Sequence, residues 1–406
     1  MTTTISDSKT QAFAGIRILD FTQVLAGPCA VMQLALLGAE VIKVEQPGSG
    51  DQMRNLLTTS TDGLSPGFQT ANLNKRSITL DLKSASAERV IAALVPRVDV
   101  VVENFKAGTM DRLGFGYGQL IEMNEGLIYC AISGYGQTGP GAGAAAYDGA
   151  IQAASGMMWQ TGQAETGPTR TGYMPCDMGT ALHAAFAISS ALLRRERTGR
   201  GQLLDVAMQD TAIVMQAAQF SNYMNEGTLP GLLGNLSSTR APTADTFPTA
   251  DGYLQISALR DNQVHTLMDV IGIGDRFAEP AFTSEQARIA NANVVQAAVR
   301  AALSEAGTAH WLEVIGRAGV PVAEVRDIPD VIRDPQLEGR GVLQEVARAD
   351  DPERSSRVVT AGFVANEDGP AIRQPAPLLG ADTHAILTEA GFSEDEVKAM
   401  QAEGAL

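Results

Sequence analysis

Short apolar runs that alternate with helical patterns occupy the first 133 residues of the chain. Runs typical of buried strands lie at residues 16–21, 40–45, 77–82, 98–103 and 127–133. Nearly continuous apolar strands separated by helices are typical of a parallel sheet that is covered on both faces. The first crossover lacks a G-x-G-x-x-G sequence, so a dinucleotide-binding fingerprint is absent. The pattern predicts an α/β domain whose ligands bind beyond the carboxyl ends of its strands.

A change in composition after residue 225 marks a second part of the chain. Residues 202–208 fit a further strand and 209–225 a helix, whereas 227–242 are rich in Gly, Pro, Ser and Asn with little periodicity. A chain of 406 residues also exceeds the usual size of a single hydrophobic core. The predicted parts are a large domain over 1–225, a smaller α+β domain over 226–325 and a tail over 326–406.

Charge and cysteine usage argue against several classes of partner. The formal net charge of −16 opposes binding to nucleic acid or an anionic membrane, because the summed field repels polyanions. No uninterrupted apolar run approaches the roughly 20 residues of a membrane helix, and the polar N-terminus lacks the apolar segment of a signal peptide. Three cysteines without a CxxC pair and four scattered histidines predict neither disulfides nor a metal site. We expect a cytoplasmic protein that binds no nucleic acid, membrane or metal.

Asp177 stands where a Gly- and Thr-rich loop runs into a long apolar helix. Apolar or small residues recur at helical spacing from Met178, and Gly199 is placed to end the helix. We therefore expect Asp177 at or next to the N-cap, where its carboxylate would accept backbone N–H bonds and stay ionised. A plain capping role is the alternative, and Cys176 is a second candidate nucleophile that would need a nearby base.

Basic residues gather near the predicted strand ends of the first half. They are Lys43, Arg54, Lys75, Arg76, Lys83, Lys106 and Arg112. Loops at such positions commonly hold phosphates, but solvated surface lysines and arginines would give the same pattern. The Gly-rich loop at 134–141 is followed by no Lys-Ser/Thr pair, so it is not a P-loop. Both interpretations of the basic residues stay open at this point.

Motifs along nearly the whole chain resemble the class III coenzyme A transferases, the family of carnitine and formyl-CoA transferases. The stretches that carry the resemblance are 19–22 (LDFT), 26–28 (AGP), 38–45 (GAEVIKVE), 74–77 (NKRS), 102–105 (VENF), 134–136 (GYG), Asp177, 198–202 (TGRGQ), 205–210 (DVAMQD), 249–253 (TADGY) and 377–380 (PLLG). Together these motifs are highly specific, and they occur in the family's order.

The resemblance implies a Rossmann-like large domain with a parallel sheet, completed by the C-terminal tail, and a smaller inserted domain. It also implies a homodimer of two interlocked chains. Asp177 would be the catalytic aspartate, and Gly134 and Gly136 would lie in a loop that donates to the oxyanion. The implied coenzyme A site comprises Gln23, Val24, Leu25, Ala26, Gln46, Leu80, Lys83, Asn104, Phe105, Lys106, Arg112, Tyr135 and Met208.

The implied reaction moves CoA from an acyl-CoA to a free carboxylic acid through covalent aspartyl intermediates, without a metal. An aspartate carboxyl group, whose pKa is ordinarily near 3.9, is ionised at pH 7 and needs no general base. Gln46 and Ser133 replace basic residues of relatives, and a consecutive-glycine loop is missing from 225–260. These departures disfavour oxalate as the acceptor, and we expect a short dicarboxylate such as succinate as donor or acceptor.

Two other activities stay open beside CoA transfer. A 2-methylacyl-CoA racemase would share the fold, and a non-catalytic CoA-binding protein would share the groove. Racemisation needs a second acid/base on the opposite face of the α-carbon, for which histidine is suited near pH 7. In the racemase branch this group is a His just before an Asp, whereas the corresponding pair here is Tyr147–Asp148. We therefore expect no racemisation.

Overall fold

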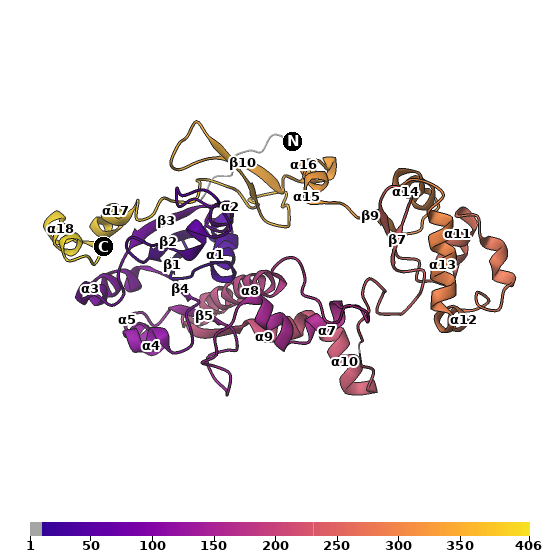
Figure 1. Cartoon of the computed structure of the whole chain (residues 1–406). Helices are drawn as coiled ribbons and strands as arrows, with labels where there is room; N and C mark the ends of the chain where they lie inside the picture. The colour runs from indigo at the N-terminus through magenta and orange to yellow at the C-terminus, as the bar shows by residue number, and fades with distance from the viewer. Residues whose placement is uncertain (1–9, 230) are drawn as a thin grey trace. The chain divides into compact units, whose positions relative to one another are not determined.

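The computed structural model describes residues 10–229 and 231–406, which form two compact units (Figure 1). The larger unit holds the chain through Ser155, Gly172–Ala217 and Pro335–Leu406, and the smaller holds Gly156–Thr171 and Ala218–Asp334. The sequence had placed the boundaries at 225 and 325, and it had not assigned 156–171 to the smaller unit. The N-terminal segment used for the signal-peptide inference lies mostly outside the described residues.

A six-stranded parallel sheet forms the centre of the larger unit. Its strands are β1 (Arg17–Asp20), β2 (Glu40–Glu45), β3 (Lys75–Thr79), β4 (Val100–Glu103), β5 (Ile128–Ser133) and β6 (Gln202–Ala207). They lie in the order β3-β2-β1-β4-β5-β6, with Ile18 of β1 opposite Val41 of β2 on one side and Val100 of β4 on the other. The predicted strands are confirmed, with ends that differ by at most three residues, the largest difference being at the end of β3. The strand order reverses between β1 and β4, which is where open α/β sheets bind ligands.

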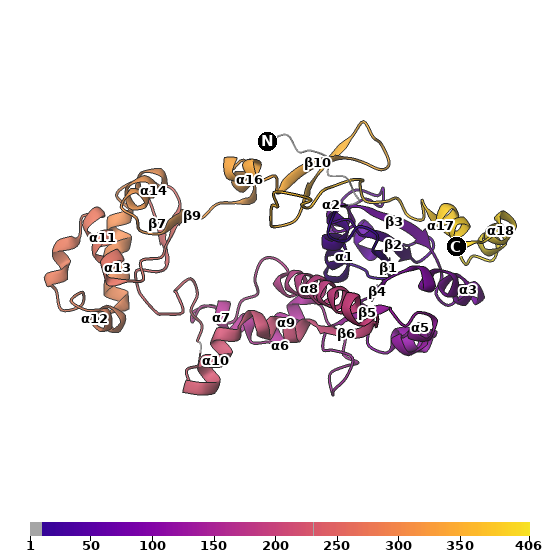
Figure 2. The ribbon, with the colours of Figure 1, turned by 180° about the vertical axis from the view of Figure 1, so that it is seen from behind.

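Helices cover both faces of the sheet because successive strand residues point to opposite sides. Ile18, Val100 and Ile128 pack against α1 (Ala26–Leu36) and α8 (Pro175–Thr198), which lie side by side in both views (Figure 2). Leu19 and Val101 face the other side, where α3 and α5 pack together with the C-terminal helices. The elements on this side are α3 (Ala85–Leu94), α5 (Tyr117–Met123), α17 (Thr383–Ala390) and α18 (Glu394–Ala402).

The long helix α8 is the structural support of the site. It begins at Pro175, three residues before the first position of the predicted pattern, and ends at Gly199, whose φ of 68° makes the left-handed cap that was expected. By length and apolar composition alone α8 could cross a membrane, but ten of its residues, including Ala181, Ala184 and Ile188, are buried in the unit. The same composition is typical of the core helix of a globular domain.

The remaining elements of the larger unit connect these layers. They are η1 (Gln52–Asn55), α2 (Pro66–Ala71), η2 (Val95–Arg97), α4 (Thr109–Leu113), α6 (Asp148–Ala154), α9 (Met208–Met215), α16 (Pro335–Arg340), and the antiparallel hairpin of β10 (Leu343–Ala347) and β11 (Ser355–Val359).

Arg54 connects the C-terminal segment of the chain to the sheet of the larger unit. Its guanidinium makes a two-pronged ion pair with Glu45 at 2.6 and 2.7 Å and donates to the Pro377 carbonyl at 3.2 Å.

The smaller unit has its own three-stranded sheet and core. Its strands are β7 (Thr246–Pro248), β8 (Tyr253–Ile256) and β9 (Val322–Glu324), and its helical elements are α7 (Met157–Thr161), α10 (Ala217–Glu226), α11 (Asp261–Val270), η3 (Gly274–Ala278), α12 (Glu285–Ala290), α13 (Ala292–Leu303), α14 (Thr308–Arg317) and α15 (Ile328–Val331). Phe247, Leu254 and Val299 are fully buried at its centre. The sequence pattern predicts one helix at 209–225 and another at 285–303, but each region is divided into two helices, at Gln216 and at Asn291.

Candidate active site

The residues predicted to bind CoA follow the carboxyl ends of the parallel strands. Gln23–Ala26 follow β1, Gln46 follows β2, Leu80 and Lys83 follow β3, Asn104–Lys106 and Arg112 follow β4, Tyr135 follows β5, and Met208 follows β6. In a parallel sheet these ends share one edge, so the topology brings the whole set to the same side. The loops after β1 and β4 are directly linked. The Asn104 side chain accepts from the Gln23 N–H and donates to the Gln23 carbonyl, both at 2.8 Å.

Asp177 is the third residue of α8, and its backbone is held by another carboxylate. Oδ2 of Asp148 accepts from the backbone N–H groups of Cys176 at 2.8 Å and Asp177 at 3.1 Å. Asp148 is buried, and its other oxygen accepts from the Gln152 side chain. The expectation that Asp177 caps its own helix is therefore wrong, because Asp148 takes up the helix N–H groups. Asp177 is half-buried, and its carboxylate does not cap the helix.

The pKa of Asp177 is higher than the sequence predicts, because the helix N–H groups bind Asp148 and not Asp177. Burial raises the pKa of Asp177 from its ordinary 3.8 to about 6, and the charge of Asp148 adds to this rise. The predicted lowering by helix N–H bonds fails because those bonds go to Asp148. At pH 7 about nine-tenths of the carboxyl is nevertheless ionised, and it is more basic than an ordinary aspartate.

Cys176 is poorly suited to be a nucleophile. Its side chain is fully buried, and burial, followed by the charges of Asp148 and Asp177, raises the pKa of its thiol to about 12. A thiol in such an environment stays protonated at neutral pH and is inert. Asp177 also influences Cys29, in the first turn of α1, where its charge adds to the effect of burial in raising the pKa of that thiol. The start of α8 packs near the start of α1, since Met178, next to Asp177, belongs to the same apolar cluster as Leu25 and Cys29.

Several basic residues near the strand ends fit neither interpretation that the sequence left open, because they form ion pairs within the protein. Lys43 pairs with Asp51 and Lys75 pairs with Asp20, each at 2.9 Å and each fully buried. Arg54 is committed to Glu45, and Arg76 pairs with Glu389 at 2.9 Å. Charges that are enclosed and paired in this way are unavailable to a phosphate. Lys83, Lys106 and Arg112 are exposed and remain as candidate phosphate contacts.

The other predicted site residues differ in what they can offer a ligand. Gln46 is exposed, whereas Leu80 and Met208 are buried, and the Leu80 N–H already donates to the Glu45 carbonyl at 2.8 Å. Tyr135 is half-buried in the loop after β5. Gly136 donates its N–H to Ser133 Oγ at 3.0 Å, so this N–H is unavailable to an oxyanion in this conformation. At Gly134 a Cβ atom would lie 2.3 Å from Cβ of Ala146, which explains the need for glycine there.

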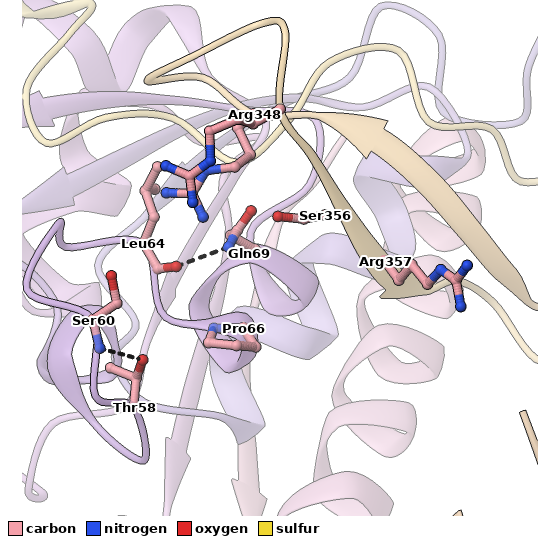
Figure 3. A pocket seen from close by; sticks show the side chains of 9 residues that line it. Thr58, Ser60, Leu64, Pro66, Gln69, Arg348, Ser356 and Arg357 are labelled. Atoms are coloured by element: carbon pink, nitrogen blue, oxygen red, sulfur yellow. Dashed lines mark hydrogen bonds between the residues drawn. The ribbon is translucent and has the colours of Figure 1, made fainter. Parts of the chain in front are cut away.

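A cavity of about 240 Å³ lies elsewhere in the larger unit, between residues 58–69 and the β10–β11 hairpin (Figure 3). Arg348 at its rim is neutralised by ion pairs with Asp62 at 2.6 Å and Asp350 at 2.7 Å, and the Arg357 side chain points away from the other lining residues. Neither Asp177 nor any predicted CoA residue lines this cavity. Among residues 10–229 and 231–406, no group of three His, Cys, Asp or Glu side chains is placed to hold a metal.

Known proteins match this chain over nearly its whole length. The sequence model of CoA-transferase family III matches residues 13–383. The acetyl-CoA:oxalate CoA-transferase of Acetobacter aceti is 36% identical over 399 residues, which cover 98% of this chain and 100% of that protein. The succinyl-CoA:glutarate CoA-transferase of Mus musculus is 32% identical over 409 residues, covering 97% and 89%. A crystal structure of a CAIB/BAIF family protein from Brucella suis superposes with a TM-score of 0.84 at 32% identity, covering 94% of this chain and 99% of that one.

Proposed function

The chain belongs to CoA-transferase family III and is a CoA-transferase, and we propose that the carboxylate of Asp177 is its covalent nucleophile. The observation that carries this proposal is the placement of Asp177. Its carboxylate is half-buried at the start of a rigid 24-residue helix and keeps a pKa of about 6. The carboxylate is therefore both more basic than usual and still largely ionised at pH 7.

The first half of the reaction transfers CoA to the enzyme. An oxygen of Asp177 attacks the thioester carbonyl of the donor, the C–S bond breaks, and CoA leaves as the thiolate. The product on the enzyme is a mixed anhydride. The thiolate then attacks the aspartyl carbonyl, which forms an aspartyl-CoA thioester and releases the donor acid as its carboxylate. Formation of the covalent intermediates replaces one difficult transfer by two easier acyl exchanges.

The second half repeats these steps with the acceptor. The acceptor carboxylate attacks the aspartyl thioester and gives a new mixed anhydride and CoA thiolate. The thiolate attacks the acceptor's acyl carbon, so that the acceptor leaves as its CoA thioester and Asp177 returns to a carboxylate. No step requires a general base, because every nucleophile is already an anion. Asp148 acts as a positioning residue, since it fixes the backbone of Asp177 through the 3.1 Å hydrogen bond.

The CoA thioester would lie along the carboxyl edge of the sheet. Its phosphates would meet the exposed Lys83, Lys106 and Arg112, and the loops after β1, β4 and β5 would enclose the thioester end. For the substrates we propose succinyl-CoA as donor and a short dicarboxylate as acceptor. One curated relative named for succinyl-CoA and glutarate, and another named for succinate and glutarate, support this choice. Oxalate stays in the test panel because the relative from Acetobacter aceti is named for it.

A homodimer of interlocked chains is also part of the proposal. Apolar side chains of α8 and α9 are exposed in the single chain. They include Leu182 at 57%, Phe186 at 72% and Leu193 on α8, and Val214 on α9. Burial of these residues by a second copy would supply a large apolar contact. Interlocked subunits should not exchange between tagged and untagged dimers under native conditions. Hybrid dimers that form within hours would contradict this part of the proposal.

The substrate test is a screen of acyl-CoA donors against a panel of carboxylic acids, with mass spectrometry of the CoA products. Transfer from succinyl-CoA to a dicarboxylate is the expected result. The absence of any new CoA thioester, together with retained CoA binding, would favour a non-catalytic CoA-binding protein. We also propose that the enzyme is cytoplasmic, which fractionation of its native cells would test.

Racemisation is the other activity that shares this fold, and the residues present do not favour it. Tyr147 is exposed where the racemase branch has its histidine, and a phenol does not serve as a base near pH 7 as an imidazole can. His183 lies further along α8, exposed, with Nδ1 3.0 Å from the Gly179 carbonyl. Incubation with one epimer of a 2-methylacyl-CoA in deuterated water should leave the α-position unlabelled. Uptake of deuterium as fast as CoA transfer would make the racemase the better assignment.

A further inference from the structure

The turn between β1 and α1 is held almost entirely by side chains from other parts of the chain. Thr22 donates its N–H to Asp20 Oδ1 at 2.9 Å and accepts at its carbonyl from Lys43 Nζ at 2.6 Å. The Asn104 amide binds both the N–H and the carbonyl of Gln23, each at 2.8 Å. The N–H of Val24 donates to Asp51 Oδ1 at 2.9 Å. Five successive polar groups of the backbone are thus bound by side chains, four of them by side chains from distant parts of the sequence.

Val24 occupies a backbone conformation that valine normally avoids. Its φ is 68°, in the left-handed region, and it is the one β-branched residue with positive φ in the part of the chain that the structure describes. A β-branched side chain is a genuine outlier there, because Cβ crowds the backbone. Strained residues of this kind persist only where surrounding contacts impose them, and they cluster at ligand sites.

The side chains that impose this conformation are themselves rigidly held. Asp51 and Lys43 form an ion pair at 2.9 Å with both side chains fully buried, and Asp51 Oδ1 also accepts from the Met53 N–H at 2.9 Å. The Lys43–Asp51 pair therefore binds the turn on both sides of Gln23, because Lys43 donates to the Thr22 carbonyl and Asp51 accepts from the Val24 N–H. Asn104 binds Gln23 itself. Each of these groups would lose buried hydrogen bonds if the turn relaxed.

The position of the turn connects it with ligand binding. It lies at the carboxyl ends of β1 and β4, between which the strand order reverses. It leads directly into α1, which packs against α8, the helix that carries Asp177. We propose that Asn104 is a positioning residue which, with the buried Lys43–Asp51 pair, forces Val24 into its left-handed conformation and so presents the turn at residues 22–26 to the CoA thioester. The proposal rests on the CoA-transfer function given above.

This role differs from that of a direct ligand, which the family resemblance implies for Asn104. Both the oxygen and the nitrogen of its amide already bind Gln23, so the amide serves the turn first. If Asn104 is a direct ligand, its contact with CoA contributes to the affinity whatever residue stands at position 24. If Asn104 is a positioning residue, it contributes to the affinity only when the residue at position 24 disfavours positive φ.

The test is a double-mutant cycle between Asn104 and Val24, read by calorimetric titration with free CoA. We expect Asn104→Ala to weaken CoA binding about tenfold, since the turn is then free to relax. In a Val24→Gly background the same substitution should cost less than about threefold, because glycine adopts positive φ without strain. Val24→Ala is the matched control. Alanine removes the valine methyl groups but still disfavours positive φ, so the loss of about tenfold should persist in that background.

Each outcome of the cycle decides the proposal. An equal loss in the glycine, alanine and valine backgrounds would identify Asn104 as a direct ligand and overturn the positioning role, as would an Asn104→Ala variant that binds CoA normally. If the Asn104→Ala variant fails to fold by circular dichroism, Asn104→Asp replaces it. Aspartate keeps the acceptor for the Gln23 N–H and loses the donor. The loss of CoA affinity that it causes should likewise be smaller in the Val24→Gly background than in the Val24→Ala background. Wild-type protein that does not bind CoA would overturn this proposal together with the proposed function, whereas binding without rescue overturns this proposal alone.

Discussion

Oδ2 of Asp148 lies 3.1 Å from the backbone nitrogen of Asp177 and accepts its hydrogen. One carboxylate therefore caps the helix that carries the other. The arrangement frees the Asp177 side chain from capping, places a second negative charge nearby, and leaves the nucleophile with a raised pKa of about 6.

The rate of CoA transfer should fall in acid with a midpoint near pH 6. The ionised form of Asp177 is the nucleophile, and its pKa is raised to about 6 by burial and by Asp148. The active form is thus present above this pH and is lost as the pH falls through it. The measurement is kcat/KM between pH 4.5 and 8, which reports the free enzyme. An acid limb centred near pH 4 would show that Asp177 titrates like an exposed aspartate.

Substitution Asp148→Asn should move the acid limb to lower pH. Asparagine keeps an oxygen to accept from the helix N–H groups but removes the charge that contributes to the raised pKa of Asp177. Since burial is the larger cause and remains, we expect a shift of about half to one pH unit. Asp148→Ala is the control that also removes the cap and should lower the rate at every pH. An unchanged limb in Asp148→Asn would mean that burial alone sets the pKa.

Substitution Asp177→Asn should stabilise the folded protein at pH 8. The pKa of Asp177 in the folded state is about 6, above its ordinary 3.8, so this group favours folding most below pH 3.8 and loses that contribution as the pH rises through 6. At pH 8 the ionised carboxylate therefore opposes folding, by about 1–2 kcal/mol after allowance for its partial exposure. Melting temperatures of the two proteins should differ at pH 8 and converge near pH 4. A variant that is less stable than wild type at pH 8 would contradict the burial argument.

Substitution Arg54→Lys should destabilise the large unit although the charge is kept. Lysine cannot reproduce the two-pronged pair with Glu45, the bond to the Pro377 carbonyl, or the stacking of the guanidinium 3.9 Å over the Phe68 ring. We expect a loss of about 2–4 kcal/mol, as for other disrupted buried pairs, measured by thermal unfolding. Arg317→Lys, at an exposed i,i+4 pair with Glu313, is the matched control and should change little.

Much of the fold was predictable because the large unit is built from local patterns. The central strands β4 and β5 are nearly continuous apolar runs, and Gly199 marks the end of α8 through its conformational freedom. The breaks at Gln216 and Asn291 were missed because helical periodicity continues across them.

The environment of the candidate site was less predictable because it depends on distant pairings. Asp177 was found from its position at a helix start and from the family motif. Asp148 begins a helix of its own, and nothing in the local sequence indicates that its carboxylate binds residues 28 and 29 positions later. In the same way, Lys75 looks like any lysine near a strand end until the fold places Asp20, 55 residues earlier, beside it. A positive φ at Val24 likewise leaves no trace in a single sequence.

The most direct test of the account is the covalent state of Asp177 itself. Wild-type enzyme incubated with acyl-CoA alone and quenched in acid should carry CoA or acyl mass on the peptide that contains Asp177, and hydroxylamine should remove it. Asp177→Ala should show no adduct and no transfer, while it still binds free CoA. An adduct on any other residue, or transfer that persists above a trace in Asp177→Ala, would contradict the assignment of Asp177 as the nucleophile.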